Sequence, residues 1–274
     1  MEKTYCALGA LYGGDDASYF ELALLSVLNQ TISVPICLVV DGPVFEPHEQ
    51  ILAKYEDSIQ HIIRLPENIG LGAALKHAIK EMAPIYDFAI RFDSDDINLP
   101  HRFESLIEAI ETEGYDLVGS HIDECEGRDL DVTINTRRVP LAFETILSTI
   151  GYRNPFNHPS VAFRIEAINN VGSYEDVRYF EDWYLWAKMI ASNAKVGNID
   201  QSLVKFRFSA EMLGRRRGFA YLRHEFNFFK KLSRLKLVGS VRLVFVVLAR
   251  MLTRVMPQKA FKFIYFGFRR LVKH

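Results

Sequence analysis

The sequence is poor in cysteine, and this limits the classes of protein that it can encode. Its 274 residues include three cysteines, Cys6, Cys37 and Cys125, and no Cys-x-x-Cys pair. An odd number of cysteines without paired spacing argues against a disulfide framework. We therefore expect reduced thiols in a cytosolic setting and assign these cysteines no role.

Three further features are missing. The amino terminus lacks the basic segment of a secretory signal, and its first apolar run stops at Gly13-Gly14-Asp15-Asp16, so we expect no signal peptide. No Gly-x-Gly-x-x-Gly motif follows the first predicted strand, which argues against a nicotinamide oxidoreductase. Near the carboxyl terminus, Arg242 and Arg250 leave only seven uninterrupted apolar residues between them, too few to span a bilayer.

The composition is that of a globular protein, at 49% hydrophobic and 24% charged residues, with a net charge of −1. The charge is unevenly spread, since residues 1–204 hold 15 Lys/Arg and 32 Asp/Glu, whereas residues 205–274 hold 18 and 2. An acidic body with a basic tail indicates an anionic partner for the tail. The length fits one large domain or one domain with an appendage.

Apolar runs alternate with helical patterns along the body. Strands are predicted at 5–11, 34–40, 59–65, 87–92 and 116–122. Between them, Ser18 and Glu21 have capping-box spacing at the start of a helix, and a second helix carries an apolar stripe. The stripe consists of Leu71, Leu75, Ala78, Ile79 and Met82. This alternation predicts an α/β fold with a largely parallel sheet and helices on both faces.

Three polar clusters follow predicted strands, and ligands of such sheets bind at the carboxyl ends of the strands. The clusters are Asp41-Gly42-Pro43, Asn68 to Gly72, and Asp93 to Asp96. Glycines at 70 and 72 allow a ligand to approach the backbone closely, beside the free N–H groups of a helix start. Each cluster also has a plain structural explanation, as a turn, a helix start or a capped loop.

The aspartates at 93, 95 and 96 crowd negative charge at the end of a buried strand, and a divalent cation would offset it. An EF-hand loop fails because Ile97 and Asn98 replace an oxygen ligand and the turn glycine. A phosphatase-type Asp-x-Asp nucleophile is expected after the first strand of such a fold, not the fourth. A solvated loop that caps the next helix is the structural alternative.

The order of these motifs resembles glycosyltransferase family 2, which has the GT-A (Rossmann-like) fold. The resemblance covers about residues 4–222 and rests on Asp41-Gly-Pro, ENIGLGAAL, RFDSDDINLPHRFE, NPFNHPSVAFR, VGSYEDVRYFEDWYLWAKM and NIDQSLVKFR, in that order. The series is most similar to the subset that assembles bacterial surface polysaccharides, such as amylovoran. It implies a catalytic domain at 1–217, with a nucleotide-sugar half (about 1–100) and an acceptor half (about 101–217).

The resemblance also implies a donor site. Asp41 would contact the nucleoside of a nucleotide sugar, Asp93 would lie near the ribose, and Asp95 would bind Mg²⁺ or Mn²⁺ on the diphosphate, with Asp93 as a further metal ligand. The chain departs from the family where Pro-x-Tyr-Asn is reduced to Tyr12 and where Leu-Asn becomes Leu75-Lys76, which leaves base recognition open. The other donor-binding candidates are Tyr12, Asn68, Gly70, Ser94, Arg216 and Arg217.

A second site is expected at 179–190. The family places its catalytic base in the Glu-Asp pair that is Glu181-Asp182 here; Asp182 would be the base and Glu181 would orient the acceptor. The alternative for Asp182 is a helix N-cap.

Trp183 is an acceptor-side candidate but has the spacing of a core residue. His158 would contact the acceptor or hold a loop. Arg216 and Arg217 would clamp the donor diphosphate or form a surface charge run.

Residues 218–274 are predicted to form a basic, amphipathic helical tail. After Pro257, apolar and basic residues fall on opposite helical faces, as in helices that lie on an anionic membrane. The alternative is packing on the catalytic domain or self-association into a homo-oligomer. Nucleic acid is not expected, because the acidic body would repel it. The apolar residues of the face are Phe261, Ile264, Phe268 and Leu271.

Together these observations predict an inverting, metal-dependent glycosyltransferase. It would move a sugar from a nucleotide sugar, with uridine diphosphate as the expected nucleotide, to a lipid-linked oligosaccharide for O-antigen, capsule or exopolysaccharide. The expected location is the cytoplasm, on the inner face of the cell membrane. The alternatives are a non-catalytic nucleotide-sugar or phosphate-binding module and a metal-dependent phosphoesterase; Asp182 argues against the first, because a binder needs no base.

Overall fold

A computed structural model describes residues 2–128, 130–208 and 218–255. A nine-stranded sheet runs through it in the order β3-β2-β1-β4-β8-β6-β9-β5, with β7 paired to β6. The strands are β1 Tyr5–Leu11, β2 Ile36–Val40, β3 His61–Arg64, β4 Phe88–Phe92, β5 Ile97–Asn98, β6 Leu117–Glu126, β7 Val132–Arg137, β8 Ala162–Arg164 and β9 Val196–Arg207.

The sheet is largely parallel, and the five predicted strands are all present. Strands β3, β2, β1 and β4 are parallel to one another, and so are β6 and β9. The short strand β8 joins these two groups by antiparallel pairing to β4 and β6. Because β8 runs against both neighbours, β4 and β6 point the same way. Because β1, β2 and β4 are parallel to one another, the loops that follow them meet at one edge of the sheet.

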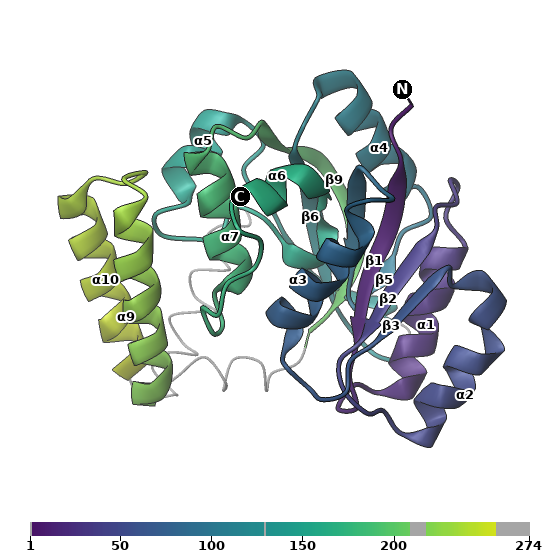
Figure 1. Ribbon diagram of the computed structural model, residues 1–274. Helices are drawn as coiled ribbons and strands as arrows, with labels where there is room; N and C mark the ends of the chain where they lie inside the picture. Colours follow the sequence, from purple (N-terminus) through teal and green to yellow (C-terminus); the bar gives the residue numbers. More distant parts are fainter. Residues whose placement is uncertain (1, 129, 209–217, 256–274) are drawn as a thin grey trace.

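Helices cover both faces of the sheet, as Figure 1 shows. One core joins the sheet to α1 (Ala17–Leu28), α2 (Glu46–Lys54) and α4 (Arg102–Glu113). The other joins it to α3 (Leu71–Met82), α6 (Ile165–Asn170) and α7 (Glu181–Ala191). The remaining short elements are α5 Phe143–Thr149 and the 3₁₀ turns η1 Glu56–Ser58 and η2 His158–Ser160.

Two local predictions need correction. Helix α1 begins two residues earlier than a Ser18 cap requires: Asp16 is the N-cap, and its carboxylate accepts hydrogen bonds from the backbone N–H groups of Ser18 and Tyr19. Leu71 is 38% exposed, because it is the first residue of α3 and lies at the open edge of the sheet. The rest of the predicted α3 stripe is buried.

Two helices follow the α/β body and pack on it. Helix α9 (Gly218–Arg234) lies beside α7, and α10 (Ser240–Val255) packs on α9, at the end of the molecule away from α1 and α2 (Figure 1). The Phe228 ring stacks on Phe180 at 4.8 Å between centroids and lies 4.7 Å from Trp183. Helix α9 is therefore part of the core.

The prediction of an amphipathic segment after Pro257 falls outside the described residues. Among residues 2–128, 130–208 and 218–255, no helix is both long and apolar enough to cross a bilayer.

Candidate active site

Asp41, which follows β2, holds the loop in front of α3. One carboxylate oxygen accepts from the Ile69 N–H (2.8 Å) and the other from the Gly70 N–H (2.9 Å), while the Asn68 amide donates to the Asp41 carbonyl. Asp41 is 4% exposed. The structure thus brings Asp41, Asn68 and Gly70 together, and in this conformation Asp41 shapes the loop.

Gly42 makes this close approach feasible. Its φ is +84°, a left-handed conformation, and an added Cβ would lie 2.5 Å from the backbone nitrogen of Asn68. Only glycine combines this backbone angle with so near a neighbouring chain.

The loop after β1 presents an aromatic ring beside the acidic cluster. The Tyr12 side chain is 45% exposed, and its ring lies against Gly14, where a Cβ would come within 2.4 Å of it. Asp15 accepts hydrogen bonds from the Ser94 hydroxyl (2.7 Å) and the Tyr12 N–H (3.2 Å). Burial raises the pKa of Asp15. Asp15 therefore adds a carboxylate to the cluster, and the sequence analysis did not assign it.

Two arginines of the protein offset part of the negative charge of the acidic cluster. Arg91, which is 1% exposed, forms an ion pair with Asp93 and also donates to the Leu8 carbonyl. The Arg207 backbone N–H donates to Asp96 (2.8 Å), and the Arg207 guanidinium donates to the Asp95 carbonyl (3.0 Å). Two arginines thus hold the ends of the cluster.

The Asp95 carboxylate belongs to the residue between Ser94 and Asp96, in the middle of this cluster. Its side chain reaches solvent, yet the surrounding protein raises its pKa to about 6, with further contributions from the Asp93 and Asp15 charges. In buried Asp96, one carboxylate oxygen has no hydrogen-bond partner, and burial raises its pKa well above the ordinary value. This part of the cluster has a deficit of positive charge that a bound cation would relieve.

The described residues contain no cluster of three or more His, Cys, Asp or Glu side chains that could hold a metal ion alone. Asp93 and Asp95 offer two carboxylates, and Asp93 keeps one oxygen that Arg91 does not engage. A donor set of one or two carboxylates completed by substrate phosphates is typical of Mg²⁺. The residues therefore fit an ion that is shared with a diphosphate.

At the start of α7, Asp182 is held from a distant loop. Its Oδ2 accepts from the Asn154 amide at 2.8 Å. The residue in the N-cap position of α7 is Phe180, and no side chain caps the helix, so the expected alternative of Asp182 as the N-cap is wrong. Asp182 lies inside the first helical turn, oriented by Asn154.

Glu181 lies beside Asp182 and close to the start of α3. A Cβ on Gly72 would lie 3.5 Å from the Glu181 side chain, which places α7 next to the start of α3. Burial and then the Asp182 charge raise the pKa of Glu181 to about 7, and its buried Oε2 has no hydrogen-bond partner. An unpartnered buried carboxyl atom is costly, and it is the kind of group that a ligand satisfies.

His158 connects the two carboxylate sites. Its Nε2 lies 2.8 Å from the Tyr174 hydroxyl. Burial and then the charge of Arg91 lower the pKa of His158, whereas Asp182 and Asp93 act in the opposite direction. The half-buried His158 ring thus feels the charges of both Asp93 and Asp182.

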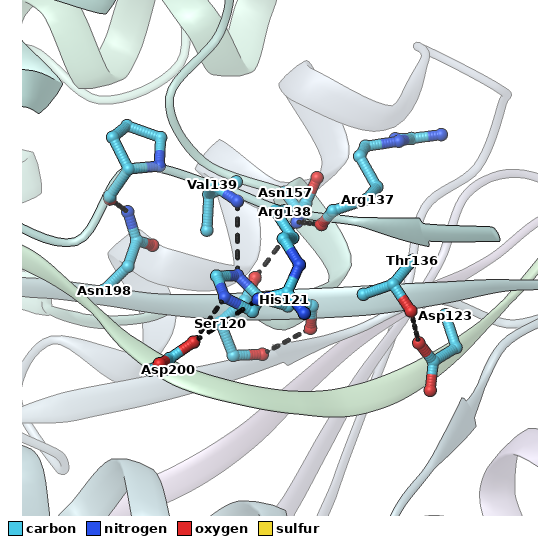
Figure 2. A network of polar contacts seen from close by, with 11 residues as sticks. Ser120, His121, Asp123, Thr136, Arg137, Arg138, Val139, Asn157, Asn198 and Asp200 are labelled. Carbon is cyan, nitrogen blue, oxygen red and sulfur yellow. Dashed lines mark hydrogen bonds and ion pairs between the residues drawn. The ribbon is translucent and has the colours of Figure 1, made fainter. Parts of the chain in front are cut away.

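A polar network fixes the segment that carries His158. The Asn157 amide donates to the carbonyls of Ser120 (3.0 Å) and Arg137 (3.4 Å), so it ties η2 to β6 and to the end of β7. Figure 2 shows this network, in which His121 also contacts Asp200 and accepts from the Val139 N–H. The motif NPFNHP therefore holds a loop through Asn157 and presents its histidine to the site.

Three further candidate site residues are Trp183, Arg216 and Arg217. Trp183 is 5% exposed, and its indole N–H donates to the Ile150 carbonyl at 2.9 Å, so the ring belongs to the core. The structure leaves it little surface for an acceptor. Arg216 and Arg217 lie outside the described residues.

The sequence analysis missed the side chains that position the site. Arg91 carried a visible signal, an arginine within an apolar strand two residues before Asp93. Asn154 and Tyr174 carried none, because each meets its partner through the tertiary fold.

Comparison with known proteins identifies the family of this chain. The family model for glycosyl transferase family 2 matches residues 12–172. The chain therefore belongs to glycosyl transferase family 2, is a glycosyltransferase and has the GT-A fold expected from its motifs.

Two curated relatives align over nearly the whole chain. The amylovoran biosynthesis glycosyltransferase AmsE of Erwinia amylovora is 31% identical over 95% of this chain and 97% of its own length. A UDP-Gal:alpha-D-GlcNAc-diphosphoundecaprenol beta-1,3-galactosyltransferase of Escherichia coli is 30% identical over 95% and 94%.

Solved structures share the fold at lower identity. TarS of Staphylococcus aureus in complex with UDP has a TM-score of 0.65 at 16% identity, covering 92% of this chain and 71% of TarS. The mannosyltransferase PcManGT of Pyrobaculum calidifontis in complex with GDP-Man and Mn²⁺ has a TM-score of 0.63 at 13% identity, covering 99% and 81%.

Proposed function

We propose that this glycosyltransferase moves a sugar from a UDP sugar to a lipid-linked oligosaccharide during surface-polysaccharide synthesis. The observation that carries the proposal is that the first turn of α7 approaches the loop before α3, since a Cβ on Gly72 would lie 3.5 Å from the Glu181 side chain. That loop shares one sheet edge with the Asp93–Asp96 cluster, because β1 pairs in parallel with both β2 and β4. Two relatives, an amylovoran biosynthesis transferase and a transferase named for a diphosphoundecaprenol-linked sugar, support the substrate classes.

On the donor side, Asp93 and Asp95 would hold Mn²⁺ or Mg²⁺ together with the donor's diphosphate oxygens. Such an ion, when bound, neutralises charge on the leaving nucleoside diphosphate. Arg91 pairs with Asp93 and holds it in place. Asp41 holds the loop before α3 through the Ile69 and Gly70 N–H groups, so the N–H groups of the first turn of α3 would remain for the donor. Tyr12, Asn68, Gly70 and Ser94 would line the nucleotide, with Arg216 and Arg217 as a further clamp on the diphosphate.

On the acceptor side, Asp182 is the general base. A sugar hydroxyl is a poor nucleophile until a carboxylate takes its proton during attack. The Asn154 amide occupies Oδ2 of Asp182 and leaves Oδ1 for that proton. Attack in one step from the face opposite the diphosphate inverts the anomeric carbon. Glu181 would orient the acceptor, with His158 as a neutral hydrogen-bonding group held by Tyr174.

The enzyme would work at the inner face of the cell membrane, where a lipid-linked acceptor resides. The exposed face of α10 supports this location, because Val241 (72% exposed), Phe245 (68%) and Leu248 (53%) recur at helical spacing. Basic residues near an anionic leaflet each add about 1 kcal/mol of attraction. The catalytic domain would span 1–217 and the tail 218–274; within the tail α9 packs into the core, so the exposed face of α10 would contact the membrane.

Co-sedimentation tests this location. The full chain should bind anionic vesicles at low salt and neutral vesicles weakly, and a chain ending at residue 255 should bind less. Absence of binding to anionic vesicles would remove membrane association and leave packing or self-association of the tail.

The proposed reaction is tested by incubating the protein with a panel of nucleotide sugars and Mn²⁺. Even slow hydrolysis of the right donor should release nucleoside diphosphate and free sugar. Release of inorganic phosphate would instead favour a phosphoesterase, and binding without turnover would favour a non-catalytic module.

A further inference from the structure

A basic groove lies between α9 and the loop that precedes α7. Its volume is about 570 Å³. Four Lys/Arg side chains line it against a single carboxylate: Arg178, Lys230, Lys231 and Arg234 against Asp176.

Most of this positive charge is unused by the fold. Lys231 forms an ion pair with Glu175 (3.0 Å), and Arg178 lies over the Tyr179 ring (5.3 Å). The side chains of Lys230 and Arg234 are exposed and make no ion pair or hydrogen bond with the part of the chain that the structure describes. Cations that neighbour one another without carboxylate partners repel, and an anion bound between them relieves the repulsion.

The groove is rigidly coupled to the catalytic helix. Glu175 accepts from both Lys188 of α7 (2.9 Å) and Lys231 of α9 (3.0 Å), which pins the loop between the two helices. The Asp176 carboxylate is close enough to Glu181 to contribute to its raised pKa. The groove and the proposed base Asp182 are therefore joined by the short segment 176–182, which begins next to the fixed Glu175.

We propose that this groove binds the phosphate groups of the lipid-linked acceptor, an assignment that rests on the proposed function. It is separate from the donor's diphosphate, which would bind at Asp93 and Asp95. Lysine and arginine are the side chains that best recognise phosphate oxygens. The lipid chain would leave along α10, whose exposed Val241, Phe245 and Leu248 lie on the helix that packs against α9.

Binding of farnesyl diphosphate tests the site directly. Calorimetry is run on the full chain in EDTA, so that no divalent ion can draw the diphosphate into the donor site. Inorganic pyrophosphate and farnesol serve as the two halves of the probe. The groove variant is Lys230→Gln/Arg234→Gln, and the matched control is Lys80→Gln/Arg138→Gln, which removes two exposed charges elsewhere.

We expect the unsubstituted chain to bind farnesyl diphosphate more tightly than either half. The groove variant should bind it at least about tenfold more weakly, since two charge-assisted contacts are lost, and the control should stay within about twofold. The assignment would be overturned if the groove variant bound farnesyl diphosphate as tightly as the unsubstituted chain does. It would also be overturned if the control lost as much affinity as the groove variant. Equal affinity for pyrophosphate would show a site for free diphosphate, and equal affinity for farnesol would show an apolar site; either result also overturns it.

Donor turnover by the unsubstituted chain is measured in parallel with the nucleotide-sugar panel. Absence of turnover with every donor would refute the proposed function. Turnover without the expected probe selectivity would refute only the groove assignment.

Discussion

Replacing Glu181 with glutamine should stabilise the protein at alkaline pH while it impairs the acceptor site. Burial and the Asp182 charge raise the pKa of Glu181 from 4.5 to about 7. Below pH 4.5 this carboxyl group is protonated in both the folded and the unfolded chain. Between pH 4.5 and 7 the unfolded chain loses its proton first, so the free energy of unfolding falls as pH rises.

The size of the effect follows from the shift. A difference of about 2.5 pKa units corresponds to at most about 3 kcal/mol, and partial solvent access to the side chain reduces this to about 1–3 kcal/mol. Glu181→Gln removes the charge, so its advantage over the unsubstituted chain should be small at pH 5 and reach about 1–3 kcal/mol at pH 8.

Urea denaturation of both proteins at pH 5, 6, 7 and 8 measures this difference. The control is Glu166→Gln, which changes an exposed glutamate in the first turn of α6. A Glu181→Gln effect that rises from pH 5 to 8 no more than the Glu166→Gln effect would refute the interpretation of Glu181 as a strained carboxyl group kept for function.

Two further substitutions test the donor side. Asp95→Ala should abolish Mn²⁺-dependent binding of nucleoside diphosphate in calorimetry, because the ion loses a ligand, whereas exposed Asp57→Ala should not; unchanged affinity for Asp95→Ala would end the metal assignment. Gly42→Ala should lower the free energy of unfolding by about 2 kcal/mol or more, since it combines positive φ with a Cβ contact at 2.5 Å. Gly114→Ala, which has φ +69° and open space around its Cβ, should cost only about 1 kcal/mol; equal costs would contradict the role of the Asn68 contact.

The sheet could be predicted from the sequence because parallel strands that are buried on both faces form continuous apolar runs. β2 (Ile36–Val40) and β4 (Phe88–Phe92) are buried at every position. Antiparallel β8 has three residues and β5 only two, too short for any periodicity to appear. The helix cap was misplaced because Asp16 and Ser18 are both good N-cap residues.

The site was predictable as a set of carboxylates but not as a charge arrangement. Crowded aspartates implied a cation, and the sequence analysis looked to a metal first. The structure adds Arg91 and Arg207, and Arg207 reaches Asp96 across 111 positions of sequence. Similarly, Asn154 meets Asp182 across 28 positions. Such contacts depend on how β9 and the loop before η2 fold back on the sheet, which no local pattern encodes.

The central claim is that Asp182 takes the proton from the acceptor, and Asp182→Asn tests it most directly. Asparagine preserves the shape of the side chain but cannot act as the base. Two quantities are measured on the same preparation. One is the transfer, to a lipid-diphosphate acceptor, of the sugar that the nucleotide-sugar panel identifies; the other is donor binding by calorimetry. Transfer by Asp182→Asn should be lower than that of the unsubstituted chain by a factor of about 10² or more, with donor affinity unchanged. Near-normal transfer by the variant would contradict the claim and leave Asp182 as a partner of Asn154 alone.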